Sequence, residues 1–308
     1  MTTPPTSVPA FSVVIPTHNR ANRIGATLRS VLAQTCGDFE LLVMDDGSTD
    51  ETERIVSSFE DPRIVYEWAG PTGGPAGPRN RGMSRAKAPW ICLLDSDDLW
   101  EPVKLERLQS MIAEHPEADV FCHHEWMENR MTGSREVLHH GPAEDGMYRR
   151  MLLEGNRLSP SATTMRKAFL DAHGLAFDPG FVIVEDFDLW LRMAENGARF
   201  HFIEETLGTY VLDDGGISTD HRRYIAQLLN LYRRHAFEVQ EFEPDRRKLW
   251  RMLRTGAKFD RLTLALARHD WLGALPHIAS CFASSPAAFL AKLTTRLRPE
   301  SPRLATEH

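Results

Sequence analysis

The chain has 308 residues, of which 42% are hydrophobic, and a formal net charge of -7 at pH 7. Its length predicts one large domain with an appendage, or two joined halves, rather than a small module. The acidic balance argues against a general nucleic-acid binder, because neutralising phosphates requires a basic surface. The four cysteines are far apart and form no C-x-x-C pair, so neither a zinc site nor a disulfide framework is indicated.

The N-terminal sequence MTTPPTSVPA lacks the basic and then apolar segments of a signal peptide. No uninterrupted apolar run reaches the roughly 18 residues that a membrane span needs. We therefore expect a soluble protein of the reducing cytoplasm without a transmembrane segment. Peripheral contact with the inner face of the membrane stays open.

The first hundred residues alternate between strand and helix patterns. Short apolar runs predict strands at residues 11–15, 39–44, 64–68 and 90–94. Apolar residues at helical spacing predict helices between them, at residues 22–34, after the capping-box sequence 48–51, and around 79–86. This β-α series predicts a largely parallel sheet covered on both faces.

The pattern changes after residue 101. We expect a helix at residues 102–115, a strand near 119–126 and a polar hairpin or flexible excursion up to 145. A helix near 185–196 and two short strands, 200–203 and 207–212, should follow. Beyond about Ser218 the pattern is helical.

Polar residues follow three of the predicted strands, where parallel sheets collect ligands. These are the segments Thr17 to Arg20, Asp45-Asp46 and Asp95-Ser96-Asp97-Asp98. Three carboxylates within four residues repel one another unless a cation, water or a cationic substrate separates them, and Mg2+ takes one or two carboxylates plus substrate phosphates. The structural alternative is that Asp97 or Asp98 only caps the next helix.

Three further features suggest ligand chemistry. Asp46 could accept hydrogen bonds from a nucleobase or ribose, or could only close an Asx turn. Arg79 and Asn80 follow a glycine-rich loop, where the arginine could pair with phosphate or base, or be solvated. In the segment Glu185-Asp186-Phe187-Asp188, a carboxylate partly desolvated by apolar neighbours would suit a general base.

The segments SVVIPTHNR, LLVMDDGSTDET, GPRNRGMSRAKAPWICLLDSDD and VEDFDLWLRM, in this order, resemble the family 2 glycosyltransferases with the GT-A fold. The resemblance covers roughly residues 11 to 213. It implies a Rossmann-like, mostly parallel sheet flanked by helices, with a C-terminal helical extension. It divides the chain into a tail (1–10), a nucleotide-sugar-binding half (11–100), an acceptor-binding half (101–217) and a helical region (218–308).

The resemblance also implies roles for individual residues. Thr17, Arg20, Asp46, Arg79, Asn80, Asp95, Ser96 and Asp97 are expected at the nucleotide-sugar donor. Two of Asp95, Asp97 and Asp98 would bind Mn2+ or Mg2+, and His221 is a further candidate ligand. Asp186 matches the family's catalytic base and is preceded by Glu185.

The resemblance implies an inverting transfer of a single sugar from a nucleoside-diphosphate sugar, with UDP favoured, to a hydroxyl of a glycan, lipid-linked or small-molecule acceptor. No Q-x-x-R-W sequence is present, which argues against a processive polysaccharide synthase. The alternatives are a sugar-1-phosphate nucleotidyltransferase and an inactive module that binds a sugar nucleotide or glycan.

The role of the C-terminal helical region is open. Its apolar stripes could pack on the catalytic domain, form a homodimer surface or lie against a membrane that carries a lipid-linked acceptor. We expect this region to influence acceptor choice more than nucleotide affinity.

Overall fold

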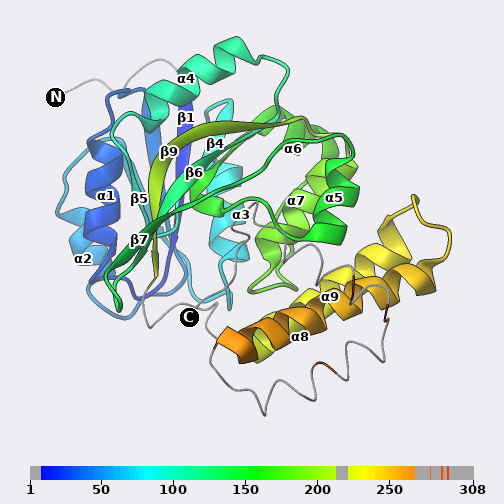
Figure 1. Cartoon of the computed structure of the whole chain (residues 1–308). Coiled ribbons are helices and arrows are strands. Elements are labelled where there is room, and N and C mark those ends of the chain that lie inside the picture. Colours follow the sequence, from blue (N-terminus) through cyan, green and yellow to red (C-terminus); the bar gives the residue numbers. More distant parts are fainter. Residues whose placement is uncertain (1–7, 213–220, 268–277, 279–285, 287–289, 291–308) are drawn as a thin grey trace. The chain divides into compact units, whose positions relative to one another are not determined.

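The structure is a computed structural model that describes residues 8–212 and 221–267, together with the single positions 278, 286 and 290 (Figure 1). For His221 and for residues 260–267 it describes the helical backbone alone. The chain divides into two compact units. The first contains Met1–Met147 and Arg157–Asp214, and the second contains Tyr148–Asn156 and Gly215–His308.

The first unit is built on one mixed sheet with the strand order β3-β2-β1-β4-β8-β6-β9-β5, and β7 pairs with β6. The four strands from β3 to β4 are parallel, as are β6 and β9, whereas β8, β5 and β7 run antiparallel to their neighbours. The strands are β1 (Phe11–Thr17), β2 (Phe39–Asp45), β3 (Ile64–Trp68), β4 (Trp90–Leu93), β5 (Leu99–Trp100), β6 (Val120–Asn129), β7 (Ser134–Leu138), β8 (Thr163–Arg166) and β9 (Phe200–Leu212).

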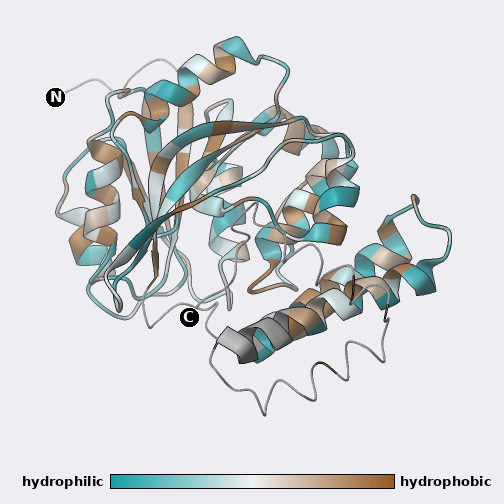
Figure 2. Cartoon of the chain, in the orientation of Figure 1, coloured by the Kyte–Doolittle hydropathy of each residue, from teal (hydrophilic) through white to brown (hydrophobic). Residues whose placement is uncertain are grey.

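Helices cover both faces of this sheet, with α1 and α2 on one side and α3 on the other (Figure 1). The helices that flank the sheet carry both hydrophobic and hydrophilic stretches (Figure 2). They are α1 (Ile24–Leu32), α2 (Thr52–Ser57), α3 (Ala76–Arg85), α4 (Lys104–Glu114), α6 (Lys167–His173) and α7 (Glu185–Glu195), with a 3-10 turn at Pro160–Ala162. The predicted fold class, a mostly parallel sheet between helices, is confirmed.

Alternation along β1 explains how one strand serves both layers, because successive side chains of a strand point to opposite faces. Val13 and Ile15 belong to the core cluster that also holds residues of α1, α2 and α4. Val14 lies against α3 on the other face, where a Cβ atom on Gly82 would collide with its side chain. The glycine therefore permits close packing of α3 on the sheet.

The first unit differs from the sequence prediction in several parts, among them the short strand β5, which was not predicted. The two strands expected at 200–203 and 207–212 form the single strand β9, whose pairing with β6 shifts register around His124. Strand β8 and helix α6 were not predicted, because the polar stretch before them has no clear period. Strand β8 lies between β4 and β6 and joins the two parallel parts of the sheet.

The second unit is helical in its described part. It contains α8 (His221–Arg234), a π-helical turn (His235–Val239) and α9 (Arg246–Ala267), together with most of α5 (Met147–Glu154). The Tyr148 hydroxyl of α5 lies 3.1 Å from Nδ1 of His235. Neither helix α5 nor its place in this unit was predicted from the sequence. Within the described residues, no helix is both long and apolar enough to cross a membrane.

Candidate functional site

The carboxyl ends of β1, β2 and β4 meet at one edge of the sheet. Thr17 lies opposite Asp45 in the β1–β2 register, and the Asp46 amide donates to the Thr17 carbonyl at 2.8 Å. On the other side of β1, the amide of Leu94, one residue before Asp95, donates to the carbonyl of Val14 at 3.1 Å. The topology therefore brings three of the predicted segments together.

The two neighbouring aspartates after β2 have different partners. Asp45 is fully buried and accepts hydrogen bonds from the Ser48 amide (2.7 Å) and the Tyr66 hydroxyl (2.8 Å), which fix the turn. Asp46 accepts from both the amide (2.8 Å) and the hydroxyl (2.6 Å) of Thr72. Asp46 thus ties the glycine-rich loop to the strand ends.

The hydroxyl of Thr17 is buried at the end of β1 and makes no hydrogen bond within the described structure. An unpartnered buried hydroxyl is costly to maintain unless something else satisfies it. Its place beside Asp46 makes it a candidate ligand contact.

The segment Asp95-Ser96-Asp97-Asp98 that follows β4 is called the acidic loop. Its three aspartates differ in exposure and in their hydrogen-bond partners. Asp95 and Asp97 keep 30% and 23% of their side-chain surface exposed, and Asp97 pairs with Arg20 at 3.3 Å. Asp98 is 1% exposed and accepts from the Ser161 hydroxyl at 2.5 Å and from the Val211 amide at 2.9 Å. Burial, with Asp97, Glu125 and Asp95 adding to it, raises the pKa of Asp98 well above its usual value.

A divalent cation would therefore bind to Asp95 and Asp97, because both carboxylate oxygens of Asp98 already accept hydrogen bonds from the protein. Two partly exposed carboxylates fit a hard cation that takes its other ligands from phosphate and water. Within residues 8–212 and 221–267, no group of three or more His, Cys, Asp or Glu side chains could hold a metal ion by itself. The side chain of His221 lies outside the described residues.

Ser96 also faces inward. It is 6% exposed, and its carbonyl accepts a hydrogen bond from the Thr27 hydroxyl at 3.0 Å. The carbonyl of Asp98 accepts from the same hydroxyl at 2.9 Å. Thr27 of α1 therefore holds the backbone of the acidic loop.

Ser161 connects the acidic loop to a buried lysine. Its hydroxyl accepts from the Asp95 amide at 3.0 Å while donating to Asp98, and its carbonyl accepts from Trp100 Nε1 (2.9 Å) and Lys104 Nζ (2.8 Å). Lys104 is 0% exposed, and its Nζ lies 3.7 Å from the centre of the Trp100 ring. Burial lowers the pKa of Lys104 to about 7.

Neither Ser161 nor Lys104 was predicted as a site residue. No local pattern marks Ser161. The sequence gives a weak indication of buried Lys104, because it precedes Leu108 by one helical turn and so lies on the same face of α4.

Arg79 bridges the acidic loop and the start of α7. Its guanidinium donates to Asp95 Oδ1 at 2.6 Å and to Glu185, and it is 3% exposed. Burial alone would lower its pKa, but Asp95 and Glu185 reverse the sign and raise it. Both terminal nitrogens of the arginine are therefore engaged by carboxylates of the protein, whereas its buried Nε makes no hydrogen bond within the described structure.

The three acids of α7 have distinct surroundings. Burial, with a contribution from Asp186, raises the pKa of Glu185 to about 8 against the opposing effect of Arg79. One carboxylate oxygen of Glu185 is buried without a hydrogen bond. Asp188 is fully buried and pairs with Arg192 at 2.7 Å. Asp186 alone among the three is partly exposed.

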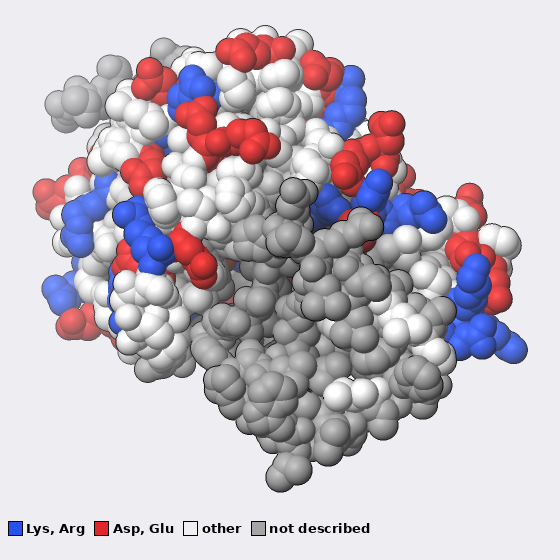
Figure 3. Space-filling model, viewed as in Figure 1, with Lys and Arg blue, Asp and Glu red and all other residues white. Residues whose placement is uncertain are grey.

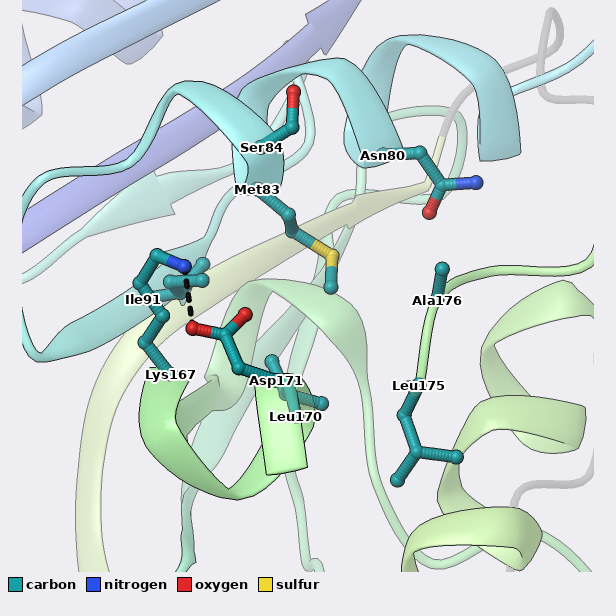
Figure 4. A pocket seen from close by; sticks show the side chains of 9 residues that line it. All are labelled: Asn80, Met83, Ser84, Ile91, Lys167, Leu170, Asp171, Leu175 and Ala176. Atoms are coloured by element: carbon teal, nitrogen blue, oxygen red, sulfur yellow. Dashed lines mark hydrogen bonds and ion pairs between the residues drawn. The ribbon is translucent and has the colours of Figure 1, made fainter. Parts of the chain in front are cut away.

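Asn80 anchors a different part of the fold. Its side chain donates to the Phe177 carbonyl and accepts from the Phe177 amide, both at 2.8 Å. It lines a small cavity of about 160 Å³ whose walls come mainly from α3 and α6, where Lys167 pairs with Asp171 (Figure 4). None of the aspartates at the ends of β2 and β4 lines this cavity; these are Asp45, Asp46, Asp95, Asp97 and Asp98.

The order of the strands, with aspartates at the carboxyl ends of β2 and β4, defines a GT-A fold. Solved glycosyltransferase structures have a similar fold. TarS of S. aureus (residues 1–349), in complex with UDP-GlcNAc, has a TM-score of 0.61 at 19% identity and covers 94% of this chain and 85% of its own. The mannosyltransferase PcManGT from Pyrobaculum calidifontis, in complex with GDP-Man and Mn2+, has a TM-score of 0.59 at 18% identity and covers 94% and 80%. At these identities the likeness concerns the fold.

The chain belongs to glycosyltransferase family 2, because the family model described as Glycosyl transferase family 2 matches residues 12–174. The Escherichia coli enzyme WfgD, a UDP-Glc:alpha-D-GlcNAc-diphosphoundecaprenol beta-1,3-glucosyltransferase, is 31% identical over 60% of this chain and 70% of its own. The succinoglycan biosynthesis protein ExoU of Rhizobium meliloti is 30% identical over 68% and 64%. The predicted family and enzyme class are thereby confirmed.

Proposed function

We propose that the protein is an inverting glycosyltransferase that moves one sugar from a UDP-sugar to an acceptor hydroxyl with the help of a divalent cation. The observation that carries this proposal is the bridge made by Arg79. It joins Asp95 of the acidic loop to Glu185 at the start of α7, and so links the donor edge to the segment of the candidate base.

The donor side uses residues at three strand ends. Thr17 and Asp46 would contact the base or ribose, since one offers an unpartnered hydroxyl and the other a carboxylate. Asp95 and Asp97 would hold Mn2+ or Mg2+, with Arg20 paired to Asp97. A bound cation would neutralise charge that develops on the departing diphosphate. The nucleotide sugars named with TarS and PcManGT, and the Mn2+ named with PcManGT, support this assignment.

Asp186 is the proposed general base. It is partly exposed, whereas Glu185 and Asp188 are buried. As the acceptor oxygen bonds to the anomeric carbon, Asp186 takes its proton and the bond from that carbon to the diphosphate breaks. The nucleoside diphosphate leaves from the face opposite the attack, which inverts the configuration.

Three residues first considered as donor contacts receive supporting roles in this proposal. Arg79 positions Asp95 and Glu185, Asn80 holds the backbone at Phe177, and Ser96 is tied inward through Thr27. Asp98 likewise supports the acidic loop instead of binding metal. Each of these four residues makes hydrogen bonds within the protein.

The proposed acceptor is a lipid-linked saccharide. The acceptor in the name of WfgD, a diphosphoundecaprenol-linked sugar, supports this choice over a free glycan or a small molecule. A direct test is the release of nucleoside diphosphate from a panel of UDP-, GDP- and dTDP-sugars, with Mn2+, with Mg2+ and with EDTA. Turnover that requires a UDP-sugar, a cation and a saccharide acceptor is expected.

Two results would contradict the proposal. Formation of a nucleotide sugar from a sugar 1-phosphate and a nucleoside triphosphate would indicate a nucleotidyltransferase. Nucleotide binding without turnover on any acceptor of the panel, lipid-linked acceptors included, would indicate an inactive binding module.

A further inference from the structure

The charges of this chain are unevenly distributed. Helices α8 and α9 contain eleven of its 36 Lys and Arg residues but only one of its 43 Asp and Glu residues. Their formal charge is therefore +10, and that of the rest of the chain is -17, which together give the overall -7. Such asymmetry within an acidic protein points to a local anionic partner.

On α9 the basic residues form a stripe. Arg247, Arg251, Arg254 and Lys258 are spaced by four, three and four positions, which places them on one face of a helix. Arg247 and Arg251 are exposed, and the other two are partly exposed. We call these four residues the basic stripe.

Helix α8 is also basic. Arg222, Arg223 and Arg233 are exposed, and the helix contains no acidic residue. Within the described part of the chain, Arg222 and Arg233 of α8 and Arg247 and Arg251 of α9 have no acidic partner. Their positive charge is therefore available to a ligand.

The apolar faces of both helices are already used. Ile225, Leu228 and Leu231 of α8 are buried, as are Leu249 and Leu253 of α9. Within residues 222–234 and 246–259, whose side chains the structure describes, these leucines and the isoleucine are buried inside the protein, so attachment of this part to a surface would be mainly electrostatic. The acidic residues of the segment between them, Glu238, Glu241, Glu243 and Asp245, lie outside the two helices. Figure 3 shows blue basic atoms and red acidic atoms side by side at the right-hand edge of the molecule.

We propose that the basic stripe and the exposed arginines of α8 bind the surface of an anionic lipid bilayer. Juxtaposed Lys and Arg side chains are attracted to anionic headgroups and lose that attraction within a Debye length. Phe242 and Met252, each 37% exposed, add apolar surface of the kind that an interface accepts. The choice of a bilayer over other polyanions rests on the proposed lipid-linked acceptor, since such an enzyme works where its acceptor is embedded.

Co-sedimentation of the full chain with vesicles tests this proposal. Binding is expected to vesicles of phosphatidylcholine mixed with phosphatidylglycerol, to be weak with phosphatidylcholine alone, and to fall steeply as salt rises. A variant with Arg222, Arg233, Arg247 and Arg251 all changed to Gln should lose about tenfold or more of its vesicle affinity. The matched control changes Arg29, Arg54, Arg85 and Arg130, all exposed in the first unit, to Gln and should bind like the parent.

Three outcomes would overturn the proposal: equal loss in the control variant, equal binding to uncharged vesicles, or tighter binding to duplex RNA than to anionic vesicles. Turnover with a water-soluble acceptor, measured without vesicles, separates this proposal from the proposed function. Unchanged turnover with no vesicle binding refutes only the lipid surface. Vesicle binding without turnover on water-soluble or vesicle-embedded acceptors refutes only the proposed reaction.

Discussion

Arg79 donates a 2.6 Å hydrogen bond to Asp95 from a guanidinium that is almost completely buried. The same guanidinium contacts Glu185, 106 positions further along the chain, so one side chain fixes the relation of the acidic loop to α7. Because the guanidinium is almost completely buried, water competes little for its charge-assisted hydrogen bonds.

Removal of this cation should therefore destabilise the fold. Arg79→Ala leaves the buried carboxylate of Glu185 and the partly exposed carboxylate of Asp95 without their partner, and we expect the free energy of unfolding to fall by roughly 3–5 kcal/mol in urea denaturation. Arg79→Lys should lose less stability, since lysine keeps the positive charge but lacks the planar guanidinium that donates to both carboxylates. Arg85→Ala, at an exposed position of the same helix, serves as the control and should change stability by less than about 0.5 kcal/mol.

The interpretation of Arg79 as a positioning residue has a clear contrary result. If Arg79→Ala folds with parental stability but no longer binds UDP, the arginine contacts the donor directly. The supporting role given to it would then be wrong.

Asp97 and Asp98 are neighbours that should respond differently to the same substitution. Asp97→Asn removes a partly exposed carboxylate, so it should abolish the effect of Mn2+ on UDP affinity and leave stability nearly unchanged. Asp98→Asn places an amide against two hydrogen-bond donors, from Ser161 and Val211, and should cost about 1–3 kcal/mol of stability.

Titration calorimetry with and without EDTA, together with urea denaturation, measures both effects. Equal UDP affinity of the parent in Mn2+ and in EDTA would contradict a role for the cation in donor binding. A loss of metal dependence in Asp98→Asn without any loss of stability would return Asp98 to the list of ligands.

The first half of the fold was predictable because its signals are local. Alternating strands and helices from β1 to β4 follow from hydrophobic period, and the edge they form follows from the parallel order. Strand β8 was not predictable in the same way. It has four residues, it lies among polar segments, and its place between β4 and β6 depends on contacts with distant strands.

The candidate site shows the same division. Sequence placed Thr17, Asp46 and Asp95 at one edge, because strand ends can be located from the pattern. It could not separate Asp97 from Asp98, since adjacent aspartates look alike until the hydrogen bonds of Ser161 and Val211 are known. Those bonds join residues 63 and 113 positions away from Asp98, a separation that no local motif reports.

Lys104 should make stability depend on pH in the alkaline range. Burial lowers its pKa from 10.5 to about 7, so between these values the unfolded chain binds a proton that the folded chain does not. The free energy of unfolding should then rise with pH across this window, by up to about 1.4 kcal/mol per pH unit, and this contribution is lost as the pH falls through 7.

Lys104→Met removes this pH dependence, so the difference in stability between parent and variant measures the contribution of Lys104. The raised pKa of Glu185 acts in the opposite direction, lowering stability as the pH rises towards about 8, but it is common to both proteins and cancels in the difference. Urea denaturation at several pH values should show parent and variant diverging between about pH 7 and 10. Lys87→Met, at an exposed lysine, is the control and should run parallel to the parent. Parallel curves for Lys104→Met would contradict a lowered pKa.

Asp186 provides the sharpest test of the proposed chemistry, because Glu185 beside it is a matched control. Asp186→Asn removes the proposed base but keeps its size, so turnover should fall by at least about a hundredfold while UDP affinity stays within a few-fold. Glu185→Gln keeps an acceptor oxygen for Arg79 but removes a charge, so it should weaken the bridge and lower stability without a comparable loss of turnover.

Single-turnover rates with a UDP-sugar and an acceptor separate loss of chemistry from loss of binding for Asp186 and Glu185. The turnover rate is divided by the concentration of folded protein, which corrects for instability of the Glu185 variant. If Asp186→Asn remains within a few-fold of the parent while folded Glu185→Gln is inactive, the proton is taken by Glu185. Its raised pKa of about 8 and its unpartnered oxygen would then be the signature of the base, and Asp186 would be its electrostatic neighbour.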